Sequence, residues 1–173
     1  MKIAVLFSNG TEEIESLTVV DVLRRAGVEC EIVSISGKNP VGSHKIGVAA
    51  DRVIEEISIE EYDGVVVPGG MPGSENISKN ERAIELIKNM FKMGNLVAAI
   101  CAAPAVVLAR HGFANGKRIT CYPSDNFKNQ LGFAIYTGAN VEVDGNIITA
   151  DGIKSAMKFA ITICDYLGVK PKF

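Results

Sequence analysis

The chain has 173 residues, 47% of them hydrophobic, with 18 lysines and arginines against 20 aspartates and glutamates, a net charge of −2. This composition predicts one globular domain over residues 1–173 with a full core. The charge balance lacks the basic excess typical of nucleic-acid binders, so we expect no nucleic-acid partner. No apolar run is long enough to span a bilayer and MKIAVLF lacks a signal-peptide pattern, so we expect no membrane partner and a cytoplasmic location.

The N-terminal half predicts strands that alternate with a helix. The apolar run Lys2–Phe7 is typical of a buried strand, and the turn sequence Ser-Asn-Gly-Thr follows it. Apolar residues at helical spacing then predict a helix from about Glu12 to Arg25. Glu29 to Ile35 alternates as a second strand. Residues 36–51, rich in glycine, predict a small antiparallel excursion instead of a core helix.

The middle of the chain repeats this alternation. Residues 58–61 predict a short helical turn, and Gly64–Val67 predicts a third core strand. The strand ends in the glycine-rich loop PGGMPG, residues 68–73. Lys79 to Met93 follows the spacing of an amphipathic helix.

Leu96 to Leu108 reads LVAAICAAPAVVL. Its first residues predict a central parallel strand buried on both faces, and Pro104 suits the first turn of a helix. Cys101 therefore falls in a sharp strand-to-helix turn, the geometry of a nucleophile elbow with cysteine in place of serine. A thiol at a helix N-terminus is expected to favour the thiolate. The alternative is an inert, buried structural cysteine.

The C-terminal third predicts another strand at Arg118–Tyr122 and a loop with a helical turn at Ser124–Gly132. Ala139–Val143 and Asn146–Ala150 flank Asp-Gly and predict a hairpin. Ser155–Leu167 predicts the last helix. Strands that alternate with helices indicate an α/β fold, with a mostly parallel sheet sandwiched by helices.

Parallel sheets bind ligands beyond the carboxyl ends of their strands. Three loops should meet there: residues 8–15, 68–73 and 101–103. The chain has four cysteines and two histidines, His44 and His111, without CxxC spacing. A zinc site of the usual kind is therefore not expected, and the cysteines should be free thiols.

Three motifs together carry a family resemblance: GTEEIE after the first strand, VVVPGG at the end of the third, and AAICAAPAVVLA around Cys101. In this order and at these spacings, the chain resembles the ThiJ/PfpI superfamily, which has a flavodoxin-like fold, over essentially its whole length. It is most similar to the branch that contains the protein deglycases (glyoxalase III-like) and the human Parkinson's-linked protein. The resemblance implies a homodimer, formed through the first helix around Leu17 to Arg25.

Glu15 is the strongest candidate partner of Cys101. It follows the first strand by one helical turn and can therefore point into the crevice. Desolvation and a neighbouring thiolate would raise its pKa, and a protonated Glu15 would donate a hydrogen bond that stabilises the thiolate. The resemblance implies the same pairing. The alternative is that Glu15 is one of three acids that decorate a helix N-terminus.

Gly69 and Gly70 lie where a backbone can approach a ligand closely. The backbone N–H groups of Gly70 and Ala102 could form an oxyanion hole, as the resemblance implies. The alternative is a plain Pro-Gly-Gly turn. Glu12 either helps to hold the crevice or only caps the helix.

Two positions depart from the family pattern. Tyr122 stands where many relatives carry a histidine; tyrosine, with a pKa near ~10, is a poor base but a good hydrogen-bond donor. His111 lies about 15 Å down a helix from Cys101, so we expect it and His44 to be surface or capping residues. The sequence DGIKS at 151–155 replaces a Gly-Pro-Gly-type loop, which indicates a different substrate side of the pocket.

The hydrolytic branches are disfavoured. Protease-like members carry histidine directly after the nucleophile, where this chain has Ala102. Glutamine amidotransferases need a His-x-Glu downstream of the cysteine, and this chain has none.

Two functions remain. The first is an enzyme without a metal or other cofactor whose Cys101 adds to a small aldehyde or glycated substrate, with Glu15 as proton shuttle and Tyr122 as hydrogen-bond donor. The second is a redox sensor of the stress response in which Cys101 is oxidised to sulfinic acid.

Overall fold

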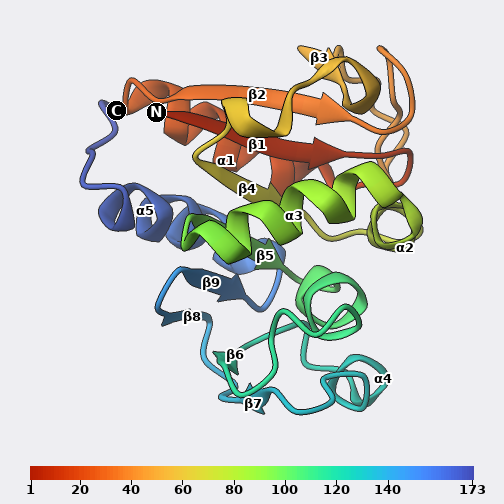
Figure 1. The fold of residues 1–173 in the computed structure, drawn as a ribbon, viewed down its shortest axis with the longest axis vertical. Helices are drawn as coiled ribbons and strands as arrows, with labels where there is room; N and C mark the ends of the chain where they lie inside the picture. Colours follow the sequence, from red (N-terminus) through yellow and green to blue (C-terminus); the bar gives the residue numbers. More distant parts are fainter.

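The computed structural model describes residues 1–173. Its main sheet has seven strands: β1 (Lys2–Phe7), β2 (Glu29–Ser34), β3 (Arg52–Val53), β4 (Gly64–Val67), β5 (Leu96–Ile100), β8 (Val141–Asp144) and β9 (Ile147–Ala150). Their order is β3-β2-β1-β4-β5-β9-β8 (Figure 1). All neighbours pair in parallel except β8 and β9, which form the predicted antiparallel hairpin. The predicted α/β class with a mostly parallel sheet is confirmed.

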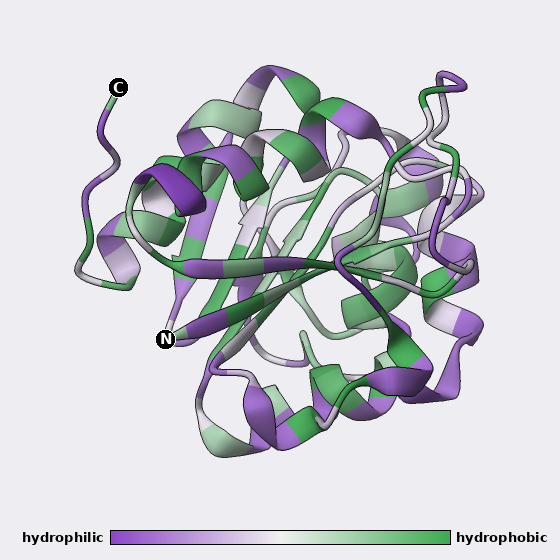
Figure 2. Cartoon of the chain, turned by 90° about the horizontal axis from the view of Figure 1, so that it is seen from above, coloured by the Kyte–Doolittle hydropathy of each residue, from purple (hydrophilic) through white to green (hydrophobic).

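Helices cover both faces of this sheet. In Figure 1, α3 lies in front of the strands, with α1 and α5 behind them. Figure 2 shows the strands between the two helical layers, whose ribbons carry both hydrophobic and hydrophilic residues. The helices are α1 (Glu13–Arg25), α2 (Gly73–Lys79), α3 (Glu81–Met93), α4 (Asp125–Lys128), α5 (Ala156–Tyr166), η1 (Ile54–Glu56), η2 (Ile59–Glu61), η3 (Pro104–Ala109) and η4 (Ile153–Ser155).

Strand alternation builds two cores, one on each face. In β1, Ile3, Val5 and Phe7 join the core under α1 and α5, whereas Ala4 and Leu6 join the core under α3. Successive side chains of a strand point to opposite faces, so a central strand must be apolar throughout. All five residues of β5 are buried, as the continuous apolar run predicts.

Several element boundaries differ from the prediction. The strand expected at Arg118–Tyr122 is limited to β6 (Arg118–Ile119), which pairs with β7 (Ile135–Tyr136) outside the main sheet. It ends there because Thr120 N–H donates to the Thr149 side chain, 2.9 Å away, instead of to a neighbouring strand.

The helix predicted over Lys79–Met93 does not begin at Lys79. Helix α2 ends at Lys79, and α3 begins at Glu81 after Asn80, whose side chain accepts from Ala83 N–H as an N-cap. Helix α2 itself, β3, β7 and η1 were not predicted. Residues 36–51 form the expected excursion, with one antiparallel bridge between Val41 and Gly47.

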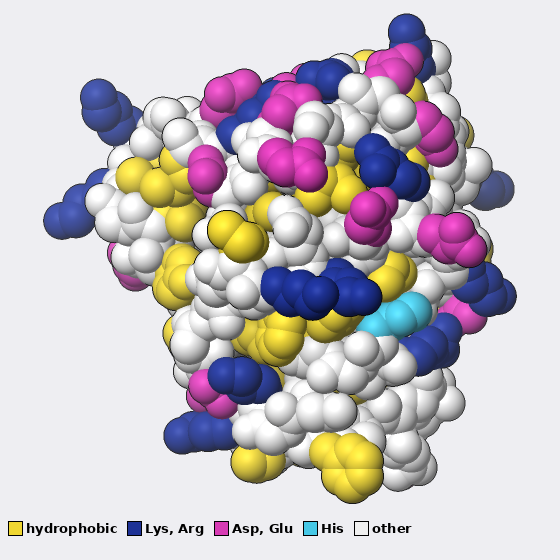
Figure 3. All heavy atoms as spheres, in the orientation of Figure 1, with side chains coloured by type: hydrophobic (Ala, Val, Ile, Leu, Met, Phe, Trp, Pro, Cys, Tyr) yellow, Lys and Arg dark blue, Asp and Glu magenta, His cyan; other side chains and the backbone are white.

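The surface carries charges of both signs. Figure 3 shows lysine and arginine interspersed with acidic side chains over the face drawn. None of the helices combines the length and the hydropathy that a bilayer crossing requires.

Candidate active site

Cys101 occupies the predicted turn between β5 and a helix. Its φ is +65°, a backbone conformation that non-glycine residues adopt rarely and often at functional sites. Hydrogen bonds hold the turn: Cys101 N–H donates to Ala150 O at 2.9 Å, and Cys101 O accepts from Tyr122 N–H at 2.8 Å. Pro104 starts the following helix η3, which has π-helical instead of α-helical geometry. The thiol is partly accessible, whereas Cys30, Cys121 and Cys164 are buried, and all four cysteines are free as predicted.

Glu15 lies beside this thiol, as predicted. Its side chain is fully buried, and Oε2 accepts the backbone N–H of Gly69 at 2.9 Å. The carboxyl also hydrogen-bonds the Cys101 side chain. Its Oε1 has no hydrogen-bond partner, which leaves a buried polar atom free for a group at the thiol.

Burial raises the pKa of Glu15 to about 7, although its hydrogen bonds to Cys101 and Gly69 act in the opposite direction. Burial also raises the pKa of the Cys101 thiol, and the Glu15 charge raises it further. The predicted stabilisation of the thiolate by its helix N-terminus stays a prediction, because the loss of hydration acts on this pKa in the opposite direction to two backbone hydrogen bonds that lower it.

Those hydrogen bonds come from the two predicted backbone donors. The N–H groups of Ala102 and Gly70 both reach the Cys101 sulfur. Gly70 has φ +88°, and a Cβ there would lie 2.6 Å from Gly10 O. A Cβ on Gly69 would lie 2.6 Å from Cys101 Cβ. Both glycines are therefore required by close approach.

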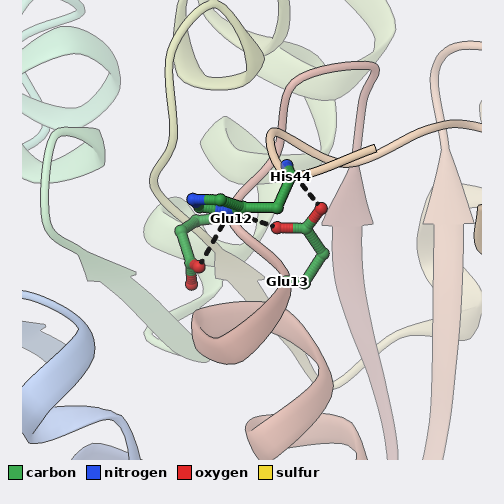
Figure 4. Close-up of side chains that lie close together, drawn as sticks. All are labelled: Glu12, Glu13 and His44. Atoms are coloured by element: carbon green, nitrogen blue, oxygen red, sulfur yellow. Dashed lines mark hydrogen bonds and ion pairs between the residues drawn. The ribbon is translucent and has the colours of Figure 1, made fainter. Parts of the chain in front are cut away.

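Glu12 caps α1 and belongs to a second cluster of polar groups. Its Oε2 accepts Glu15 N–H at 2.8 Å, and its Oε1 lies 3.7 Å from His44 Nδ1. Figure 4 shows His44 between Glu12 and Glu13. Glu13 accepts from His44 N–H at 2.7 Å and contacts His44 Nδ1 at 3.0 Å. Glu12 thus caps the helix through Glu15 N–H, and its contact with His44 also connects this part of the site to the excursion, residues 36–51.

Glu12, Glu13 and His44 place potential metal-ligand atoms within 4.8 Å of one another. Glu13, however, already accepts from Ser43 Oγ at 3.1 Å as well as from His44. These hydrogen bonds lower the pKa of Glu13 to about 2, despite its burial. The pKa of His44 is raised by the same carboxylate. Glu13 and His44 thus form an ion pair that holds residues 41–47 against the start of α1.

Tyr122 lies at the mouth of the site with half of its surface exposed. Together with residues 151–154 it lines a pocket of about 330 Å³. A Cβ on Gly152 would lie 3.5 Å from the Tyr122 ring and 4.0 Å from Cys101 Sγ, so Gly152 lines this pocket and faces the thiol. His111 lies elsewhere: its Nε2 contacts Ser78 O at 3.0 Å, at the C-terminal end of α2, which agrees with the predicted capping role.

The model of the DJ-1/PfpI family matches residues 1–165. The chain belongs to this family. Protein dj-1beta of Drosophila melanogaster is 37% identical over 97% of this chain and 90% of its own length. The Parkinson disease protein 7 homolog of Danio rerio is 37% identical over 94% of this chain and 87% of its own. The predicted resemblance to the branch with the Parkinson's-linked protein is confirmed.

Solved structures agree with this DJ-1/PfpI assignment. Oxidized DJ-1 of Toxoplasma gondii superposes with a TM-score of 0.91 and is 35% identical, covering 96% of this chain and 90% of that one. Drosophila melanogaster DJ-1beta superposes with a TM-score of 0.90 at 35% identity, covering 96% and 91%.

The sequence did not predict the roles of His44, Glu13 and Gly152 in the surroundings of the site. His44 meets Glu13 across 31 positions, and no local spacing connects a loop residue to a helix N-terminus at that separation. The three acidic residues in GTEEIE could have indicated these contacts, because it was improbable that all three side chains would only be exposed at a helix N-terminus.

Proposed function

We propose that this DJ-1/PfpI protein is a cofactor-independent cysteine enzyme of the glyoxalase III or deglycase type, acting on small reactive carbonyls or their protein adducts. The observation that carries the proposal is the contact between Cys101 and a buried Glu15 whose pKa is about 7. A carboxyl with a pKa near the operating pH can both donate and accept a proton, because neither transfer is strongly unfavourable. The family resemblance supplies the substrate class.

The first step would be addition of the Cys101 sulfur to the aldehyde carbon. Glu15 takes the thiol proton as the S–C bond forms, which spares the site a resting thiolate. The carbonyl oxygen becomes an oxyanion, and the N–H groups of Gly70 and Ala102 that reach the sulfur are placed to donate to it. Protonation of that oxygen completes a hemithioacetal.

With methylglyoxal, the second step moves a proton within the adduct. Glu15 removes the C1 proton and returns a proton to C2, while the proton of the C1 hydroxyl passes to the C2 oxygen, which converts the hemithioacetal into a lactoyl thioester of Cys101. Water then hydrolyses the thioester, so methylglyoxal and one water give lactate and free thiol. Tyr122 would donate a hydrogen bond at the pocket mouth, where its side chain is half exposed.

The test is lactate formation from methylglyoxal by the wild-type protein and by C101S and E15Q. Both variants should lose at least a hundredfold in kcat/KM, because each lacks a group that takes part in bond making. Glu81→Gln is a matched control, since Glu81 also lies in the first turn of a helix but is exposed. Unchanged lactate production in C101S or E15Q would overturn the proposal.

A second candidate function is a sensor of oxidative stress that uses the same thiol. Cys101 is the one accessible cysteine of the four, and the N–H groups around its sulfur could bind sulfinate oxygens. A solved relative, Toxoplasma gondii DJ-1, is described as oxidized. Intact mass after mild peroxide tests this function: a gain of about 32 Da on Cys101 supports it, and none excludes it.

We also propose a homodimer formed through α1, as the family resemblance implies. Ile14 on this helix leaves 52% of its surface exposed, which suits a contact with a second copy. Sedimentation of the wild type and of Ile14→Lys tests it: the substitution should shift the protein towards a monomer, and a monomeric wild type would contradict the proposal.

A further inference from the structure

The pocket beside Cys101 has a specific lining. Its volume is about 330 Å³, and its walls are Tyr122, Pro123, Asp151, Gly152, Ile153 and Lys154. Gly152 lines this pocket and faces the thiol, because a Cβ there would lie 4.0 Å from Cys101 Sγ. Since glycine leaves this space open, a small molecule bound through one end in the pocket could present its other end to the sulfur.

Two charged side chains, Asp151 and Lys154, line the pocket. They differ in whether their polar atoms are already hydrogen-bonded to the protein. Asp151 accepts from Ser155 Oγ with one oxygen and from Asn140 Nδ2, at 2.9 Å, with the other. Both of its oxygens are thus engaged with the protein. Lys154 is exposed and takes part in none of the ion pairs and none of the side-chain hydrogen bonds of the chain. The ammonium group is therefore the charged group of the pocket whose hydrogen-bonding capacity remains free for a ligand.

We propose that Lys154 selects substrates that carry an anionic group, so that this site favours 2-oxoaldehydes with a carboxylate or phosphate over neutral ones of the same size. The proposal rests on the proposed function for the reacting thiol. A lysine ammonium at a pocket wall attracts an oxyanion with little geometric demand, which suits recognition of either group. Since Tyr122 and Ile153 supply apolar walls, the anion gives the substrate its orientation and places the carbonyl towards Cys101.

The test compares two alkylating reagents of similar size and opposite charge state at Cys101. Iodoacetate carries a carboxylate and iodoacetamide is neutral, so the ratio of their rates measures how the site treats an anion. The other three cysteines are buried, and peptide mass assigns the modification to Cys101. The variants are Lys154→Met and Lys154→Glu, with Lys170→Met as the control. Lys170 is an exposed lysine beyond α5 that also lacks an ion pair, and it lies on the C-terminal segment.

We expect the iodoacetate-to-iodoacetamide ratio to fall about fivefold in Lys154→Met, further in Lys154→Glu, and not at all in Lys170→Met. An equal ratio in the wild type and Lys154→Met would overturn the proposal. The KM for 4,5-dioxovalerate, a 2-oxoaldehyde that carries a carboxylate, should rise in Lys154→Met while the KM for methylglyoxal stays constant. If no carbonyl is turned over but the ratio depends on Lys154, the proposed function fails and the anion site stands. If lactate forms and the ratio is indifferent to Lys154, only the anion site fails.

Discussion

Gly69 donates its backbone N–H to Glu15 Oε2 at 2.9 Å, which fixes a buried carboxyl from a loop 54 positions away. One oxygen is thereby occupied, and the other, Oε1, has no hydrogen-bond partner. The same contact explains the glycine, since a Cβ at position 69 would lie against this carboxyl. The loop after β4 therefore orients Glu15, whereas burial is the main cause of its raised pKa.

Glu15 should lower the stability of the fold as the pH rises. Its folded pKa of about 7 lies above the ordinary 4.5, so the folded state binds more protons between these values and stability falls as pH increases through them. The total effect is on the order of 3 kcal/mol. Glu15→Gln removes the titration, so the variant should gain stability relative to the wild type between pH 5 and pH 8. Urea unfolding at both pH values measures this, and parallel changes in the two proteins would contradict it.

The same substitution should lower the pKa of Cys101. In the wild type, the Glu15 charge and burial both raise this pKa, and Glu15→Gln removes the charge while keeping the volume. The pH dependence of iodoacetamide alkylation provides the measurement, with a wild-type value above the ~8.5 of a free thiol. A higher pKa in the variant would instead show that a protonated Glu15 stabilises a resting thiolate.

Gly70→Ala should destabilise the protein well beyond the cost of its backbone conformation. Gly70 has φ +88°, and its Cβ would approach the Glu12 backbone and lie 2.6 Å from Gly10 O. Gly94 has φ +71° with nothing within 4 Å of such a Cβ, so Gly94→Ala isolates the conformational cost of about 1 kcal/mol. Thermal unfolding of both variants gives the comparison. Equal losses would mean that the contact of Gly70 with the β1–α1 turn relaxes freely.

The Glu13–His44 pair should contribute to stability mainly between about pH 4.5 and 6.5. The pKa of Glu13 is lowered to about 2, so its contribution is full above its unfolded value of 4.5 and is lost as the pH falls towards 2. The pKa of His44 is raised above 6.5, so its contribution is full below 6.5 and is lost as the pH rises through the folded value.

Glu13→Gln should therefore cost most near pH 5.5 and less at pH 3 and pH 9. Thermal unfolding across this range measures it. Glu55→Gln is the control, because Glu55 is exposed and lies in the short helix η1. A cost that is independent of pH would show that the contact is a neutral hydrogen bond and not an ion pair.

Local pattern accounts for most of the fold. Five-residue apolar runs such as Leu96–Ile100 can only be central parallel strands when helical segments separate them, because both faces must be covered. The Cys101 turn follows from the same stretch, since Pro104 can begin a helix but not continue a strand. The limits of β6 were not predictable, because a strand ends where its neighbour does, and that neighbour, β7, lies 16 positions further on.

For this protein, the sequence by itself determined the layered α/β sheet, the turn at Cys101 and the glycine-rich loop after β4, because motifs and short-range periodicity encode these features. Only the tertiary structure buried Glu15 beside Cys101, and burial against distant segments raises the pKa of both groups. It also decided that His44 fastens the excursion to Glu13 and that Lys154 stands unpaired in the pocket. Dielectric environment and long-range contacts depend on the whole chain, and no spacing within one segment carries them.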